Sequence, residues 1–148
     1  MRGLLLKFLL TCLLLNAGNA FAVNTYAVLF DTAEFKCLVK NIYYEARGQS
    51  IVGQEAVALV TINRAKHPSY PSSICAAVYQ KHQFSWTSNR NLVVTDRAAW
   101  KRAENVAYQV LLGTHSLGQF KALNFHATHV NPGWGKPRVA KIGNHIFY

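Results

Sequence analysis

The chain has 148 residues, enough for one domain with a hydrophobic core. It contains no internal repeat, long linker or low-complexity segment, which excludes a repeat array. Its 16 Lys and Arg residues outnumber its 6 Asp and Glu residues, giving a formal net charge of +10. This excess of basic residues indicates a polyanionic partner, for which nucleic acid and an anionic cell envelope are two candidates.

Residues 1–22 are predicted to be a secretory signal peptide. Arg2 gives a positive start, an apolar run interrupted by Lys7 follows, and Ala20-Phe-Ala22 fits a small-x-small cleavage signal. A retained membrane anchor is the alternative, but the apolar core is short for a membrane span. We therefore expect a protein exported to the periplasm or the extracellular space, with no stable membrane anchor after signal removal.

The mature chain would then run over residues 23–148 as one domain and a monomer. It would carry 14 basic and 6 acidic residues, a formal charge of +8. Two cysteines remain, Cys37 and Cys75, and an even pair in an oxidising compartment favours one disulfide. Two buried thiols are the alternative, and a nucleophilic cysteine paired with a distant histidine has no local support.

Capping residues, apolar spacing and glycines at helix ends predict helices in the first three quarters of the chain. The predicted helices cover residues 33–46, 51–65, 74–79 and 96–112. The last part predicts three strands instead, with a Gly143-Asn144 turn between the second and the third. The predicted strands cover residues 122–126, 138–142 and 145–148. Helices followed by strands indicate an α+β fold with a small C-terminal antiparallel sheet.

Glu45 stands apart from the other acidic residues. The others lie near predicted helix N-termini or pair within a helix: Asp31, Glu34, Glu55, Asp96 and Glu104. Glu45 lies in the last turn of its helix, where the helix dipole disfavours a carboxylate, and on the apolar face of Leu38 and Ile42. Both effects raise its pKa, and an acid protonated near neutrality can act as a general acid. The alternative is a carboxylate neutralised by Arg47 or another base.

Aromatic rings alternate with polar residues around Gln83-Phe-Ser-Trp86, with Tyr79 one helical turn upstream. Rings stack on the apolar faces of sugars, and amides bond hydroxyl or N-acetyl groups, so this stretch is typical of a carbohydrate site. The alternative is that Phe84 and Trp86 belong to the core.

Two histidines in Asn124-Phe-His126-Ala-Thr-His129 have H-x-x-H spacing, which invites a metal interpretation. On a strand, residues three apart point to opposite faces, and no third ligand lies nearby in sequence. We therefore expect no metal or other cofactor, and a hydrogen-bonding role for His126 beside the acid. The loop around Trp134 is either a substrate-lining loop or a rigid turn. No stretch resembles a nucleic-acid module, so we expect no nucleic-acid partner.

Several motifs, taken together and in order, resemble the SleB/CwlJ-type cell wall hydrolases. They are Ile42-Tyr-Tyr-Glu-Ala-Arg-Gly48, Gly53-Gln54, Val60 to Arg64, Pro71 to Gln80, Gln83-Phe-Ser-Trp86, Phe125-His-Ala127, Val130-x-Pro-x-Trp134 and Ile142-Gly-x-His-Ile-Phe-Tyr148. The resemblance implies a lysozyme-like fold and cleavage of peptidoglycan glycan strands, with Glu45 as the catalytic acid. It also implies a cleft of substrate-binding residues. The expected cleft residues are Tyr44, Tyr79, Gln83, Phe84, Trp86, Asn124, His126 and Trp134.

The sequence departs from this family's pattern at three positions. Gln49 stands where Glu is commoner, His129 where Tyr is commoner, and Asn124 near a usual Thr. These departures bear on substrate preference and on any auxiliary acid at position 49, and they leave Glu45 intact.

The expected activity is a lytic transglycosylase that cleaves the β-1,4 bond between N-acetylmuramic acid and N-acetylglucosamine. Glu45 would protonate the glycosidic oxygen and then, as a base, help the C6 hydroxyl to close a 1,6-anhydro ring. Three alternatives remain open: a hydrolytic muramidase using Glu45 with Glu55 or a water positioned by Gln83, a non-catalytic cationic wall-binding protein, and a metal-dependent amidase using His126 and His129.

Overall fold

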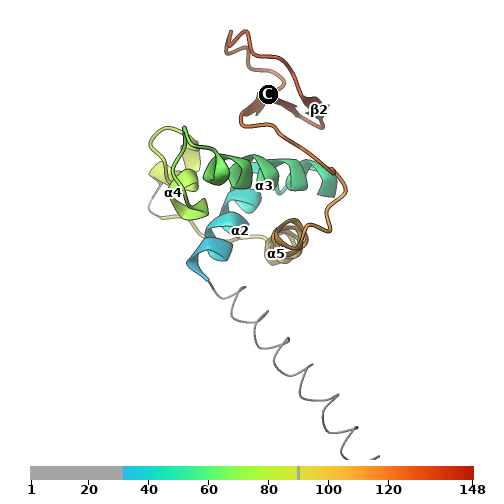
Figure 1. The fold of residues 1–148 in the computed structure, drawn as a ribbon. Helices are drawn as coiled ribbons and strands as arrows, with labels where there is room; N and C mark the ends of the chain where they lie inside the picture. The colour runs from blue at the N-terminus through green and yellow to red at the C-terminus, as the bar shows by residue number, and fades with distance from the viewer. Residues whose placement is uncertain (1–31, 90) are drawn as a thin grey trace, which may run out of the picture. The chain divides into compact units, whose positions relative to one another are not determined.

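The computed structural model describes residues 32–89 and 91–148, and residues 33–148 form one unit (Figure 1). The predicted signal peptide and Asp31 lie outside the described residues. Within the described residues, four α-helices and one short 3₁₀ helix precede three strands. They are α2 (Ala33–Ala46), α3 (Ile51–Lys66), α4 (Ile74–Val78), η1 (Ser85–Ser88), α5 (Arg97–Leu112), β1 (Phe125–Ala127), β2 (Ala140–Ile142) and β3 (His145–Phe147).

Local capping chemistry sets the ends of the longer helices. The Ser50 side chain accepts a hydrogen bond from Gly53 N at 3.2 Å and begins α3. Asp96 accepts one from Ala99 N at 2.8 Å and begins α5. Gly113 ends α5 with φ +72°, a left-handed conformation that glycine adopts at low cost. The predicted α3 and α5 therefore agree with the structure to within one residue.

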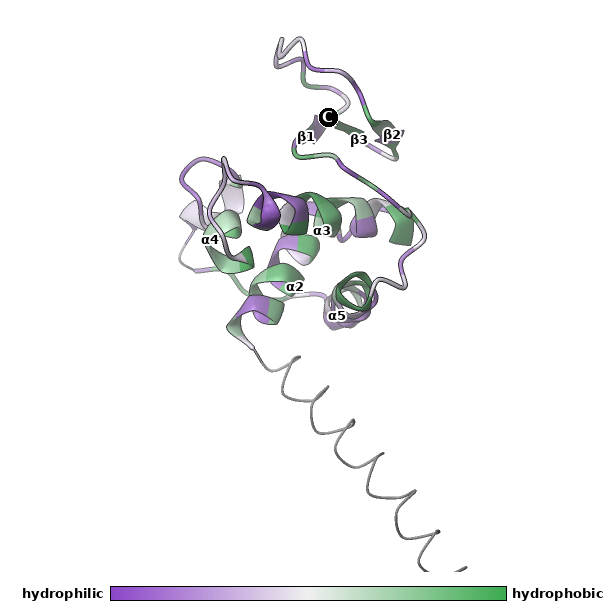
Figure 2. Cartoon of the chain, viewed as in Figure 1, coloured by the Kyte–Doolittle hydropathy of each residue, from purple (hydrophilic) through white to green (hydrophobic). Residues whose placement is uncertain are grey.

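The core lies between the helices, and α3 is its centre. Most of α3 is buried, and it contacts α2, α4 and α5 as well as β2. Hydrophobic and hydrophilic residues alternate along α2 and α5 in Figure 2, as expected for helices that each bury one face. Inside this packing, Asn41 of α2 donates to the Thr61 hydroxyl of α3 at 2.9 Å, so the buried amide nitrogen is satisfied.

The C-terminal strands form an antiparallel sheet in the order β1-β3-β2, and the predicted α+β, lysozyme-like fold is confirmed. The predicted hairpin is present, but the predicted strand over residues 122–126 was misplaced, because β1 covers Phe125–Ala127. Residues 120–123 instead lie against α3. There the Asn63 amide donates to the carbonyls of Phe120 and Ala122 at 2.7 and 3.1 Å, and Arg64 Nε donates to Leu123 O at 2.6 Å.

One disulfide links two of the helices. Cys37 of α2 and Cys75 of α4 form a disulfide that closes a loop of 38 residues.

Among residues 32–89 and 91–148, no helix has both the length and the apolar character needed to span a bilayer.

Candidate active site

Glu45 lines a pocket of about 650 Å³ between the helical part and the sheet. The residues that line the pocket come from α2, α3, β1, β3, η1 and the segment just before η1. They are Glu45, Arg64, His82, Gln83, Phe84, Ser85, Ser88, Phe125, His126, Ala127, Val130 and His145. Glu45 is the one carboxylic acid among these lining residues, so any acid–base chemistry by a carboxyl group in this pocket belongs to it.

Burial raises the pKa of the Glu45 carboxyl from 4.5 to about 7. Loss of hydration is the cause, and no neighbouring base opposes it. Arg47, the predicted neutralising partner, lies over the Tyr43 ring instead, with its guanidinium carbon 5.1 Å from the ring centroid. The predicted rise in pKa is therefore confirmed. Near pH 7 the carboxyl is present in both protonation states, as a group that first donates and then accepts a proton requires.

Arg64 brings a second ionisable group into this pocket. Its side chain is only 5% exposed, and it lies over the rings of Tyr70 and Phe84 at 5.3 and 5.7 Å. Nε binds the Leu123 carbonyl, while Nη1 is buried without a hydrogen-bond partner in the described structure. Burial lowers the pKa of the guanidinium, but the ordinary pKa of arginine lies so far above neutrality that the group stays charged at neutral pH. Arg64 thus ties the chain before β1 to α3 and places a positive charge beside the pocket.

Two of the three histidines that line the pocket, His126 and His145, lie on the strands of the sheet. His126 Nδ1 donates to the Ala127 carbonyl at 2.8 Å, and its Nε2 accepts from the Tyr148 hydroxyl at 2.9 Å in the neutral ring. His126 therefore lines the pocket as predicted, but its partners are Ala127 and Tyr148 rather than the acid. Burial, with a smaller effect of His126, lowers the pKa of His145, which keeps that ring neutral at pH 7.

The predicted substrate-binding residues divide among three places. Gln83, Phe84 and His126 lie in the pocket with Glu45. Tyr44, Tyr79 and Trp86 line a separate pocket on the other side of η1. The other two lie elsewhere: Asn124 accepts a long 3.5 Å hydrogen bond from the Tyr70 hydroxyl, and Trp134, 42% exposed, packs its edge against His126 and Tyr148.

The residues of the alternative mechanisms lie outside the Glu45 pocket. Glu55 is buried, and its carboxylate accepts hydrogen bonds from the backbone N–H and the hydroxyl of Ser116. His129 is exposed and follows the end of β1. Within the part of the chain that the structure describes, no group of three or more His, Cys, Asp or Glu side chains is placed to hold a metal ion.

Sequence reasoning missed Arg64 and His145 as pocket residues, although both lie in motifs that carried the family resemblance. Their partners are distant in sequence, so no local pattern reveals that they face Glu45. The sequence carried no clear signal for Arg64, because basic residues such as Arg64 and Lys66 are common at the exposed end of a helix.

A half-buried carboxyl group with a raised pKa, in a pocket between helices and a small sheet, is typical of a lysozyme-like class of enzyme site. The chain belongs to the cell wall hydrolase family, whose model matches residues 48–148. The match begins three residues after Glu45, so the case for Glu45 rests on its burial and its pocket.

Relatives of known name support the same family. The spore cortex-lytic enzymes of Halalkalibacterium halodurans and Bacillus subtilis are 28% and 26% identical over 128 and 125 residues, covering 85% and 80% of this chain. The chain spans only 37% and 38% of their lengths. The catalytic domain of the germination-specific lytic transglycosylase SleB from Bacillus anthracis superimposes with a TM-score of 0.65 at 25% identity. That superposition covers 77% of this chain and 92% of the SleB domain.

Proposed function

We propose that this protein is a peptidoglycan lytic transglycosylase that cleaves the β-1,4 bond between N-acetylmuramic acid and N-acetylglucosamine. The observation that carries the proposal is the solitary, half-buried Glu45 with a pKa of about 7. The family and the similarity to a SleB catalytic domain support the same reaction class.

In the proposed mechanism, protonated Glu45 donates its proton to the glycosidic oxygen as the C1–O bond breaks. Positive charge develops at the anomeric carbon of the muramoyl residue, and the N-acetyl oxygen of that sugar stabilises it. Glu45, now a carboxylate, accepts the proton of the C6 hydroxyl as its oxygen bonds to C1. The products are a 1,6-anhydro-muramoyl end and a free C4 hydroxyl, and Glu45 is again protonated.

This route needs one carboxyl group, whereas the usual glycoside hydrolases use two. Glu55, the predicted second carboxylate of a muramidase, is bonded to Ser116 and absent from the pocket lining. A hydrolytic outcome would instead need a water held near the sugar. Gln83 lies in the same pocket and keeps the muramidase with a positioned water as the second candidate.

The test is mass spectrometry of the soluble fragments released from purified sacculi, with Glu45→Gln as the comparison. We expect fragments that end in 1,6-anhydro-muramic acid from the wild-type protein and none from the variant. Fragments heavier by one water, with a reducing end, would show the muramidase reaction instead. Release of peptides from intact glycan would indicate the amidase, and sacculus binding without any soluble product would indicate a wall-binding protein.

A further inference from the structure

A second pocket, of about 250 Å³, shares a wall with the Glu45 pocket. The shared wall is η1, because Ser85 and Ser88 line the Glu45 pocket while Trp86 and Thr87 line the second one. The two pockets also meet along α2, where Glu45 directly follows Tyr44, which lines the second pocket. A ligand group held in the second pocket would therefore lie close to a strand held at Glu45.

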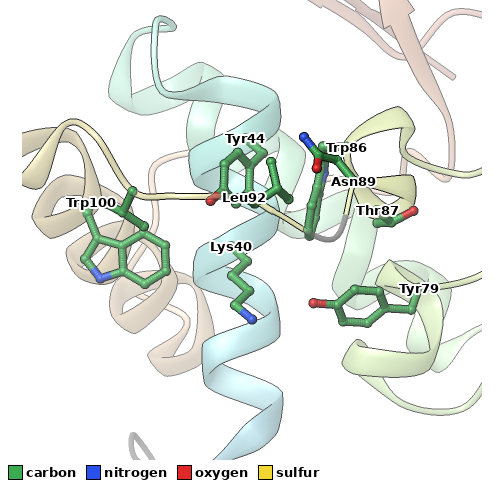
Figure 3. A pocket seen from close by; sticks show the side chains of 9 residues that line it. Lys40, Tyr44, Tyr79, Trp86, Thr87, Asn89, Leu92 and Trp100 are labelled. Carbon is green, nitrogen blue, oxygen red and sulfur yellow. The ribbon is translucent and has the colours of Figure 1, made fainter.

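Aromatic side chains form much of the second pocket (Figure 3). Trp86 lies between Tyr44 and Tyr79, with ring centroids 4.9 and 5.9 Å away. The Trp86 and Tyr44 planes are only 30° apart, so these two rings cover each other's faces. Because one face of each ring is covered in this way, less aromatic surface is left for a sugar ring to stack on.

Lys40 supplies the charge of this pocket. It lies on α2 one turn before Tyr44, and Figure 3 shows its amine between Trp100 and Tyr79. No acidic residue lines the pocket. The described acids have other partners or line the Glu45 pocket: Glu34 with Cys75 N, Glu55 with Ser116, Asp96 with Ala99, Glu104 with Lys101 and with Trp100 of this pocket, and Glu45 itself. Lys40 is thus a cation with no anionic partner among residues 32–89 and 91–148.

We propose that this second pocket binds a carboxylate carried by a muramoyl residue of the glycan strand, with Lys40 as the charged contact. This inference rests on the proposed function, because it takes the strand at Glu45 to be peptidoglycan. A muramoyl residue carries a carboxylate in one of two forms. A residue without a stem has a free lactyl carboxylate, and a residue with a stem has the carboxylates of its peptide. Asn89 offers its side-chain amide nitrogen as a further donor, whereas the Thr87 hydroxyl donates to the Phe84 carbonyl at 2.7 Å.

The test is calorimetric titration of the Glu45→Gln protein, which does not consume its ligand, with soluble uncrosslinked strands. One set of strands keeps its stems, a second has had them removed by an amidase, and matched samples of both have their carboxylates converted to amides. Lys40→Ala is compared with Lys40→Arg, which keeps the charge, and with Lys121→Ala, which removes an exposed charge outside both pockets. Thermal unfolding of each variant checks that it is folded.

Lys40 is exposed, so Lys40→Ala should weaken binding of carboxylate-bearing strands roughly twofold to fivefold, the range of a contact made by an exposed charge. Lys40→Arg should restore most of the affinity. Amidated strands should bind the protein with Lys40 and the Lys40→Ala variant with equal affinity. A loss confined to stem-free strands assigns the lactyl carboxylate, and one confined to stem-bearing strands assigns the peptide. The inference is overturned if Lys40→Ala matches Lys121→Ala, or if it weakens amidated strands equally. Lys40-dependent binding by a protein whose wild type releases no glycan fragments would reject the proposed function and leave this inference standing.

Discussion

The side-chain oxygen of Gln49 accepts a hydrogen bond from the backbone N–H of Asn144 at 3.1 Å. Gln49 lies just after α2, four residues beyond Glu45, and Asn144 lies in the turn between β2 and β3. The bond therefore joins the segment that carries the acid to the hairpin that carries His145. A Cβ atom on Gly143 would collide with the same Gln49 oxygen, so a side chain there would displace Gln49, and the φ of +53° at this position also favours glycine.

We predict that Gln49→Ala lowers the free energy of unfolding by about 0.5–1.5 kcal/mol, the usual net value of one hydrogen bond. Gln49→Glu keeps an acceptor oxygen at the same position and should retain most of the stability. Urea unfolding followed by circular dichroism measures both. Equal losses in the two variants would show that the acceptor oxygen is unimportant. On this account, position 49 serves as a hydrogen-bond acceptor rather than as an auxiliary acid.

The activity should fall as pH rises through about 7, because the acid step needs protonated Glu45 and burial sets its pKa there. A pH profile of kcat/KM on soluble strands measures this. Glu45→Gln should lose at least about a hundredfold in rate at every pH. Glu104→Gln, which removes an acid outside the pocket, should leave the profile unchanged. A profile flat between pH 6 and 9 would contradict the assignment of Glu45 as the acid.

The same pKa predicts a pH-dependent stability. The folded state holds the Glu45 proton up to about pH 7, whereas the unfolded chain releases it near 4.5, so the folded state binds more protons between these values. The wild type should therefore lose stability relative to Glu45→Gln as pH rises from 4.5 to 7, by about 1–3 kcal/mol in total. Unfolding free energies at pH 4, 6 and 8 for both proteins give the difference. A difference that is constant with pH would show that burial does not perturb this carboxyl.

Reduction of the Cys37–Cys75 bond should separate α4 from α2 in the unfolded chain and cost about 2–4 kcal/mol of stability. Thiol labelling of the unreduced, denatured protein should find neither cysteine free. The Cys37→Ser, Cys75→Ser double variant should match the reduced wild type in thermal unfolding. Full labelling of both cysteines without reductant would refute the disulfide.

Much of the fold was predictable because its signals are local. Ser50 and Asp96 begin helices and Gly113 ends one, each through contacts within a few residues, and Gly143-Asn144 forms a tight turn. The start of β1 was not predictable. Ala122 and Leu123 read as strand residues, but Asn63 and Arg64 hold the backbone there against α3, and these partners lie 59 residues away in sequence.

The candidate site also has a part that the sequence predicted and a part that it did not. The position of Glu45 on the apolar face of its helix and in the last turn predicted a raised pKa, and burial is the cause that the structure bears out. The split of the aromatic residues between two pockets depends on η1, which turns Ser85 and Trp86 to opposite sides of one wall. No pattern along the chain reveals that wall, because Tyr44 and Trp86 meet only in the folded protein.

Arg64 and Glu45 line the same pocket, so the net charge of the pocket depends on whether Glu45 is protonated. Below about pH 7 the Glu45 carboxyl is mostly neutral, so the charged Arg64 leaves the pocket more positive and more attractive to a polyanion. Above pH 7 the Glu45 carboxylate offsets part of this positive charge, and the attraction weakens. One protonation therefore governs both how readily an anionic strand is captured and whether the acid that would cleave it holds its proton.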